Sequence, residues 1–381
     1  MKNIASILTL ITVALCAIAL SVPPEVHAQS SALPLGTVTV HDPGFPCSTA
    51  LNGTLFLPGM NCFHAAISCP NTDSIGIVFG YSVPSGTIQG TIVTFSSGSG
   101  TSPSEYADDN LAYLSAYQAK FVVVQLEYSS PWEYPYSTSG QPGNILNAAC
   151  RPATFLNWVN NNVGLHPSGK AMCAQGASAG SAAIGYSMAW YGASSYLKNV
   201  ELLSGPTLSE IDQGCLFPKP MTNLNICVPG QYGCTPKTVE WNDNQEYVSF
   251  YVGRVNQWTG LNSCAVSGAQ NNMTAWAAMS LVDGTSAGVT PTFSYSTTTM
   301  HGWLCASSDP CDADHCPNNS AAQGNYFYEA LDSSNQTLQL TGVTACYQEE
   351  GVGMGRDPDG NHGQGQLASL SITSDMQTNC Q

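Results

Sequence analysis

Positively charged residues are scarce in this sequence. Only nine of its 381 residues are lysine or arginine, against 25 aspartates and glutamates, and the formal net charge is −16. A protein that binds a phosphate backbone needs clustered cations to neutralise it, and the sequence has no such cluster. The composition therefore excludes nucleic acid as a partner, and it makes an anionic membrane surface unattractive for the same reason.

Long apolar runs are also absent after the first thirty residues. The single one, from about Ile4 to Val22, follows an early lysine and precedes Val26-His27-Ala28, which has small residues at both key positions of a cleavage site. This pattern is typical of a secretory signal peptide over residues 1–28; an uncleaved membrane anchor is the alternative. We expect a secreted protein, extracellular or periplasmic, without stable membrane insertion.

Cysteine is plentiful, in contrast. The chain has fifteen cysteines, of which Cys16 leaves with the signal peptide, and the remaining even number in an oxidising compartment predicts mostly disulfides. Connectivity cannot be deduced from spacing alone. Because the cysteines gather near residues 47–69, 215–264 and 305–316, we expect mainly local bridges within loops.

Strand-like and helix-like segments alternate along most of the chain. Residues 29–73 lack periodicity and predict a disulfide-tied N-terminal extension, whereas residues 74–381 predict one large α/β domain with a mostly parallel sheet flanked by helices. Residues 207–290, rich in cysteine and tryptophan, interrupt the alternation and predict a cap insertion. The expected strands are 74–84, 86–97 (a neighbour of the first), 120–128, 170–175, 199–206, 290–300 and 337–347, and the expected helices are 105–118, 151–163, 181–192, 325–333 and 366–377.

Two pentapeptides, GASAG at 176–180 and GTSAG at 284–288, fit the pattern Gly-x-Ser-x-Gly. A serine hydroxyl becomes a nucleophile on a sharp strand-to-helix turn, next to a base and to backbone N–H groups that hold an oxyanion. Ser178 lies between a predicted strand and a predicted helix. Ser286 has the reverse order, a helix before it and a strand after it. The sequence therefore favours Ser178 as the nucleophile, with Ser286 in a loop.

From about Ser74 to His362, the order of elements around Ser178 resembles that of the α/β-hydrolase superfamily. The resemblance implies that one oxyanion-hole N–H comes from the residue after the nucleophile, Ala179, and the other from the loop after the strand containing GTIVTF. That loop is SSGSG, which points to Ser99. The HG or HGGG sequence that is frequent in the family is missing there.

The resemblance also implies the order serine, acid, histidine. His362 follows the last predicted strand and precedes the last helix, so its loop should lie at the carboxyl edge of the sheet, and we expect it to be the general base. His301, at the end of the predicted strand 290–300, matches a non-catalytic His-Gly of relatives. The acid is expected at Asp314, three residues before Pro317. Asp312 and Asp309 remain alternatives.

No metal site and no cofactor are expected. Asp309, Asp312, Asp314 and His315 are interleaved with cysteines that should be oxidised, and the segment from Asp357 to Asn361 lacks the remaining ligands of a calcium loop. Three aromatic residues after the strand 120–128 are expected to line an apolar substrate pocket. These residues are Trp132, Tyr134 and Tyr136; packing in a core is the alternative.

These features predict a secreted serine esterase that forms an acyl-enzyme on a small or polymer-derived ester. The resemblance extends to extracellular polyester depolymerases and plant-wall esterases. A serine peptidase of the same fold and a catalytically silent hydrolase-like binding protein remain as alternatives. The sequence leaves the oligomeric state and the acyl length open.

Overall fold

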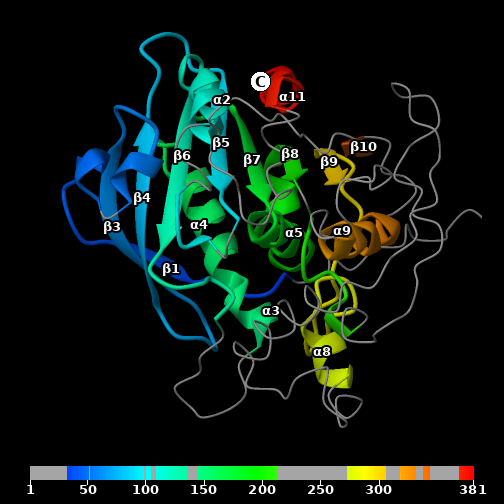
Figure 1. The fold of residues 1–381 in the computed structure, drawn as a ribbon. Helices are drawn as coiled ribbons and strands as arrows, with labels where there is room; N and C mark the ends of the chain where they lie inside the picture. The colour runs from blue at the N-terminus through cyan, green and yellow to red at the C-terminus, as the bar shows by residue number, and fades with distance from the viewer. Residues whose placement is uncertain are drawn as a thin grey trace, which may run out of the picture. The chain divides into compact units, whose positions relative to one another are not determined.

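The fold is built on one large mixed sheet with helices on both faces (Figure 1). The computed structural model describes residues 32–50, 52–97, 100–103, 109–134, 144–203, 205–212, 273–305, 318–331, 338–343 and 369–381. Within these ranges the sheet has ten strands in the order β1-β3-β4-β6-β5-β7-β8-β9-β10, with the short β2 paired to β3. The strands are β1 (Thr37–Val40), β2 (Phe45–Pro46), β3 (Asn61–Ser68), β4 (Ile75–Ser82), β5 (Gly90–Phe95), β6 (Phe121–Tyr128), β7 (Ala171–Ala177), β8 (Leu197–Leu203), β9 (Thr299–Cys305) and β10 (Leu338–Val343).

The six strands β5 to β10 run parallel to one another. Strands β1, β3 and β4 add an antiparallel edge next to β6. The predicted fold class, a mostly parallel sheet flanked by helices, is therefore confirmed. The expectation that β4 and β5 are neighbours is wrong, because β6 lies between them. A parallel partner for β5 requires a crossover, and α2 (Asp109–Gln118) supplies it between β5 and β6.

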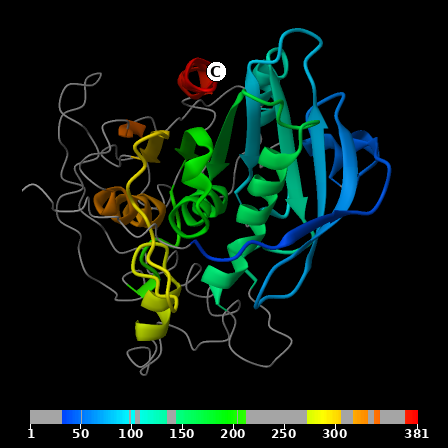
Figure 2. The same cartoon turned by 180° about the vertical axis from the view of Figure 1, so that it is seen from behind.

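Each face of the sheet has its own core. Successive side chains of a strand point to opposite faces, and β6 shows this directly: Val122 and Val124 belong to one core cluster and Val123 to another. The first cluster is covered by α4 (Cys150–Asn161) and α5 (Ala179–Tyr191), and the second by α2 and α11 (Ser369–Asn379). Figure 1 and Figure 2 show these helices around the central strands.

The remaining described helices either belong to the carboxyl half of the chain or are single short turns between other elements. They are α3 (Ile145–Ala148), α8 (Met273–Met279), α9 (Asn318–Ala330) and the 3-10 helices η1 (Cys47–Thr49), η2 (Gly53–Leu55) and η4 (Ala193–Ser195). The central helix α5 is buried along its whole length, and small residues at its start let it approach the sheet closely. Most of the predicted insertion, residues 213–272, lies outside the described residues.

Two regions of the chain differ from the sequence-based expectations. Residues 290–298 carry no strand, and β9 begins at Thr299, so His301 stands near the start of that strand rather than at its end. The β-branched and aromatic residues that suggested an earlier strand include Tyr295, which packs against Phe327 of α9. The other difference lies in residues 29–73, where no strand is expected: β1, β2 and β3 form there, and β3 pairs with β4 inside the main sheet.

Three disulfides join cysteines of the described residues. Cys47–Cys62 closes a loop of 15 residues, as expected of a local bridge. For Cys69–Cys150 and Cys173–Cys380 the expectation of local bridges is wrong, since the paired residues are 81 and 207 positions apart. The long-range pairs were hidden from the sequence because the sheet, not the spacing, brings the partners together. A separate observation is that none of the described helices combines the length and the apolar character that crossing a bilayer requires.

Candidate active site

Ser178 occupies the turn between the central strand β7 and the helix α5. Its backbone has φ 50° and ψ −112°, a conformation that non-glycine residues rarely adopt and that usually occurs at functional sites. The Ser178 N–H donates a 2.8 Å hydrogen bond to the carbonyl of Leu203 at the end of β8, and the residue as a whole is 6% exposed. The turn therefore holds this serine in a strained and well-defined position at the carboxyl edge of the sheet.

The two glycines of GASAG are required by close packing. A Cβ placed on Gly176 would lie 2.4 Å from the backbone of Gly180, and a Cβ on Gly180 would lie 2.3 Å from the carbonyl oxygen of Phe95. Real Cβ atoms are never that close to backbone atoms. The start of α5 can therefore lie directly against the end of β5 only because both positions are glycine.

Ala179 is the first residue of α5. The first helical hydrogen bond runs from the N–H of Ala182 to the carbonyl of Ser178 at 3.1 Å, so the Ala179 N–H precedes the helical ladder and is among the groups that a helix leaves for other acceptors. The helix dipole adds positive potential at the same end. Negative charge that develops next to Ser178 would thus face a favourable field.

The loop that follows β5 lies against the start of α5. Ser96 contacts Gly180, since a Cβ on that glycine would lie 2.8 Å from the Ser96 carbonyl oxygen. The Ser96 hydroxyl donates to the carbonyl of Ser102, and the N–H of Gly100 donates to the carbonyl of Ser97 at 3.0 Å, which closes a turn. Ser99, the expected second oxyanion donor, lies outside the described residues.

The expected acid and base also lie outside the described residues. The segment with Asp309, Asp312 and Asp314 follows Cys305, the last residue of β9, and the segment with His362 follows Val343, the last residue of β10. Both strands are parallel to β8 and, through it, to β7. Each segment therefore begins at the sheet edge where Ser178 stands.

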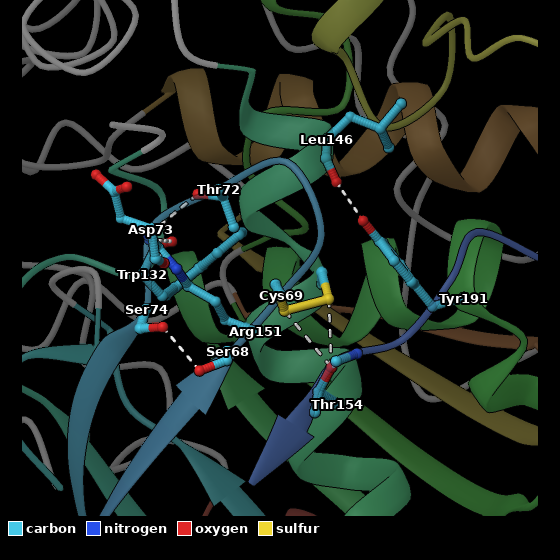
Figure 3. The surroundings of a disulfide bond; sticks show 12 residues. Ser68, Cys69, Thr72, Asp73, Ser74, Trp132, Leu146, Arg151, Thr154 and Tyr191 are labelled. Carbon is cyan, nitrogen blue, oxygen red and sulfur yellow. Dashed lines mark hydrogen bonds between the residues drawn. A yellow bond between two sulfur atoms is a disulfide. The ribbon is translucent and has the colours of Figure 1, made fainter. Parts of the chain in front are cut away.

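The loop after β6 is anchored by a buried arginine. Arg151 of α4 is 3% exposed and donates hydrogen bonds to the carbonyls of Trp132 (2.8 Å), Tyr134 (2.7 Å) and Asp73 (2.9 Å) and to the hydroxyl of Thr72 (3.2 Å). Figure 3 shows this guanidinium beside the Cys69–Cys150 disulfide. The arginine and the disulfide together fix the connection between β3 and β4 against the loop after β6.

The three aromatic residues of this loop have different surroundings. Trp132 is 1% exposed and packs edge-on against Tyr186 of α5, with ring centroids 6.3 Å apart. Tyr134 is partly buried and borders the core. Tyr136 lies outside the described residues. A Cβ on Gly100 would be 3.6 Å from the Trp132 ring, so the loop after β5 touches the loop after β6.

The sequence did not point to the loop after β8, which also borders Ser178. A Cβ on Gly205 would lie 2.0 Å from the Ser181 hydroxyl and 3.3 Å from the Ser178 carbonyl oxygen. Tyr328 of α9 donates a 2.8 Å hydrogen bond to the Gly205 carbonyl, and burial raises the pKa of Tyr328 well above its usual range, so its hydroxyl stays a donor. The signal available was the Gly-Pro pair directly after an apolar strand.

The second serine of the Gly-x-Ser-x-Gly type has no comparable setting. Ser286 pairs with Val289 through an isolated antiparallel bridge in a turn, and Gly288 has φ 78°. No strand enters this turn and no helix begins at Ser286. The expectation that Ser286 lies in a loop is confirmed.

Comparisons with known proteins give structural neighbours only. No protein-family model and no curated protein sequence matches the chain. Among solved structures, acetyl xylan esterase 1 from Thermoanaerobacterium sp. JW/SL YS485 is 12% identical, covers 89% of this chain and 88% of its own, and has a TM-score of 0.48. A fungal esterase from Rhizomucor miehei is 13% identical, with 85% of each chain covered and a TM-score of 0.47. The carboxylesterase EstE1, cloned from a metagenomic library, is 11% identical, with 86% and 90% covered and a TM-score of 0.44. Similarity at this level assigns no role to any residue.

Proposed function

We propose that the protein is a secreted α/β-hydrolase that cleaves carboxylic esters with Ser178 as nucleophile. The observation that carries the proposal is the backbone of Ser178, strained at φ 50° on a strand-to-helix turn at the carboxyl edge of a parallel sheet. Folding stability gains nothing from such strain, and a strand-to-helix turn of this kind sets a nucleophilic hydroxyl beside the N–H groups at a helix start.

In the proposed mechanism, the Ser178 oxygen attacks the ester carbonyl while His362 accepts its proton. The negative charge of the tetrahedral intermediate is held by the N–H groups of Ala179 and Ser99. His362 then gives the proton to the leaving alcohol, and water hydrolyses the acyl-enzyme by the same steps. The position of Ala179 ahead of the helical ladder supports its part, and the contact of the loop after β5 with Gly180 supports the part of Ser99.

Asp314 is proposed to orient His362 and to stabilise its charged form, with Asp312 and Asp309 as alternatives. Support comes from topology. The segments with these residues start after β9 and β10, whose carboxyl ends share an edge with β7. A serine after β7, an acid after β9 and a histidine after β10 have the chain order of α/β-hydrolases.

The substrate is proposed to be a small or polymer-derived ester with an apolar, phenolic or sugar group that binds Tyr134 and Tyr136, whereas Trp132, 1% exposed, packs in the core and supports their loop. The fixation of the loop after β6 by Arg151 supports this role, because a binding wall is most selective when it is rigid. Passage through an oxidising compartment is supported by three disulfides in the described residues. The signal peptide over residues 1–28 remains part of the proposal.

The test uses a fluorophosphonate probe, which labels activated serines covalently, on the purified mature chain. Labelling should be lost in Ser178→Ala and retained in Ser286→Ala, the matched control with the same pentapeptide pattern. Turnover of p-nitrophenyl acetate should likewise be lost in Ser178→Ala and retained in Ser286→Ala. Wild-type protein that takes up no label would instead favour the catalytically silent binding protein.

A second measurement separates the esterase from the peptidase of the same fold. Turnover of ester and of the corresponding peptide or anilide substrates is compared at equal enzyme concentration. Ester turnover that depends on Ser178, with no amide cleavage, supports the proposal. Amide cleavage at comparable kcat/KM would contradict it.

A further inference from the structure

A cluster of buried polar side chains lies between the sheet and α11, apart from the residues assigned above. Glu201 of β8 is fully buried, His301 of β9 is 7% exposed, and Asp375 of α11 is largely buried. One ligand atom from each of these three side chains can be chosen so that all lie within 4.8 Å of one another. The three residues are more than 70 positions apart in the sequence, so tertiary structure alone brings them together.

The distances from Nδ1 of His301 to the two carboxyl groups leave room for a shared ion. The Nδ1 atom of His301 lies 3.8 Å from Oδ1 of Asp375 and 4.0 Å from Oε2 of Glu201, both beyond hydrogen-bond length. Ligands of a tetrahedral zinc ion with bonds of about 2.0–2.2 Å stand roughly 3.3–3.6 Å apart. A displacement of a few tenths of an ångström would bring Nδ1 to that spacing from both oxygens.

The groups are already oriented by neighbours. The indole N–H of Trp303 donates to Oε2 of Glu201 at 2.5 Å, and the ring of Trp303 stacks on His301 with centroids 4.1 Å apart. Asn379 donates to Oδ1 of Asp375 at 2.9 Å. Metal ligands are typically held in this way by a surrounding layer of hydrogen bonds and packing.

A fourth polar side chain borders the same cluster. Asn199 is fully buried, and its Nδ2 donates to Oδ2 of Asp375 at 3.3 Å and to Oε1 of Glu201 at 3.4 Å. The carboxamide therefore helps to position the two carboxyl groups.

The electrostatics agree with a cation. Two carboxyl groups share a buried site, and among the described residues no lysine or arginine pairs with either of them. Like charges at close range in a poorly solvated site repel each other, and a divalent ion would remove that cost.

We propose that Glu201, His301 and Asp375 bind a divalent cation of the zinc type that fastens α11 to the sheet. One imidazole and several oxygens suit Zn²⁺, whereas Ca²⁺ selects oxygen ligands only. The site differs from the Ser178 turn in its residues, and it lies on the sheet face covered by α2 and α11, not on the α5 face.

The experiment measures zinc bound to the purified full mature chain. Protein stripped with EDTA is dialysed against ZnCl₂ and its metal is counted by mass spectrometry, with titration calorimetry for affinity. One Zn²⁺ per chain is expected, with affinity at least about 100-fold weaker in His301→Ala and Asp375→Asn. His64→Ala is the matched control: His64 also faces an aspartate, Asp42, at 2.5 Å, but its side chain is 58% exposed. This variant should bind zinc as the wild type does, and Ca²⁺ should not compete.

A second readout on wild-type protein covers the case in which the variants fail to fold. The zinc X-ray absorption spectrum should show imidazole nitrogen and oxygen ligands. Absence of stoichiometric zinc, retention of zinc in both folded variants, or a spectrum dominated by sulfur would overturn the proposal. Ser178→Ala protein should bind zinc normally, so that failure of the hydrolase proposal and failure of the cation site are told apart.

Discussion

The hydroxyl of Ser181 donates a 2.6 Å hydrogen bond to the backbone carbonyl of Ser178. The same Ser178 carbonyl accepts from Ala182 N–H, while the Ser178 N–H is held by Leu203 of the adjacent strand. The strained peptide is thus fixed from the helix on one side and from β8 on the other. This arrangement locates strain energy at one residue and makes that energy measurable.

Replacing Ser178 by glycine should stabilise the fold relative to replacing it by alanine. Both changes remove the hydroxyl, but only glycine adopts φ 50° without steric cost. Relief of strain should exceed the extra entropy of unfolded glycine, so we expect Ser178→Gly to have a free energy of unfolding about 1 kcal/mol above that of Ser178→Ala. Urea denaturation of the two variants checks this. Equal stabilities would mean that the turn stores no strain.

Gly180→Ala should disturb the turn at Ser178, whereas the control variant Gly86→Ala should leave that turn unchanged. The new methyl group at 180 would lie 2.3 Å from the Phe95 carbonyl oxygen, whereas a Cβ on Gly86 meets nothing within 4 Å. We expect Gly180→Ala to lose about 1–3 kcal/mol of stability through overpacking. Its fluorophosphonate labelling should fall as well, because the serine turn must shift. The measurements are chemical denaturation and labelling rate. A Gly180→Ala variant as stable as Gly86→Ala would contradict the close approach.

Arg151→Met should destabilise the fold strongly. The change deprives three buried or partly buried carbonyls and one hydroxyl of their donor, and unsatisfied buried acceptors cost about 1–3 kcal/mol each. A loss of about 3 kcal/mol or more is expected by thermal or urea denaturation. Lys198→Met, which removes an exposed cation in β8, is the control and should change stability little. A small loss in Arg151→Met would show that water replaces the guanidinium.

Because of Glu210, the free energy of unfolding should fall as the pH rises from about 4.5 to 7. Burial, with smaller contributions from Asp283, Asp212 and Glu329, raises the pKa of Glu210 to about 7. In that interval the folded chain keeps a proton that the unfolded chain has released, so each step up in pH favours unfolding. Glu210→Gln should flatten this part of the curve of melting temperature against pH. Asp283→Asn removes one of the charges that raise the pKa of Glu210, so stability should fall over a narrower pH interval in that variant. A wild-type curve that Glu210→Gln leaves unchanged would rule out the raised pKa.

The disulfide Cys173–Cys380 should contribute more stability than Cys47–Cys62. It closes a loop of 207 residues rather than 15, and the entropy that a bridge removes from the unfolded chain grows with loop length. We expect the double alanine variant at 173 and 380 to lose about 3–5 kcal/mol and the one at 47 and 62 somewhat less, within the usual range. Comparison of their urea denaturation midpoints decides. The reverse order would mean that residual structure in the unfolded chain outweighs loop entropy.

Local chemistry was sufficient for several elements of the site. The short strand-like run before Ser178, the small residues after it and the flanking glycines predicted the turn between β7 and α5, because each of these signals acts over a few residues. The same reasoning placed Ser286 in a loop. The position of His301 within its strand could not be predicted in this way. Residues 290–298 have strand-like composition, but Tyr295 packs against Phe327 of α9 and this segment does not join the sheet.

The sequence by itself determined the alternation of strands and helices, the parallel sheet and the strand-to-helix turn at Ser178, since periodicity and turn residues act locally. Only the tertiary structure decided that β6 lies between β4 and β5, that Cys173 pairs with Cys380, and that Glu201, His301 and Asp375 meet. These relationships join residues far apart in the chain. They depend on how helices cross over and pack on the sheet, a property of the whole fold that no single stretch of sequence contains.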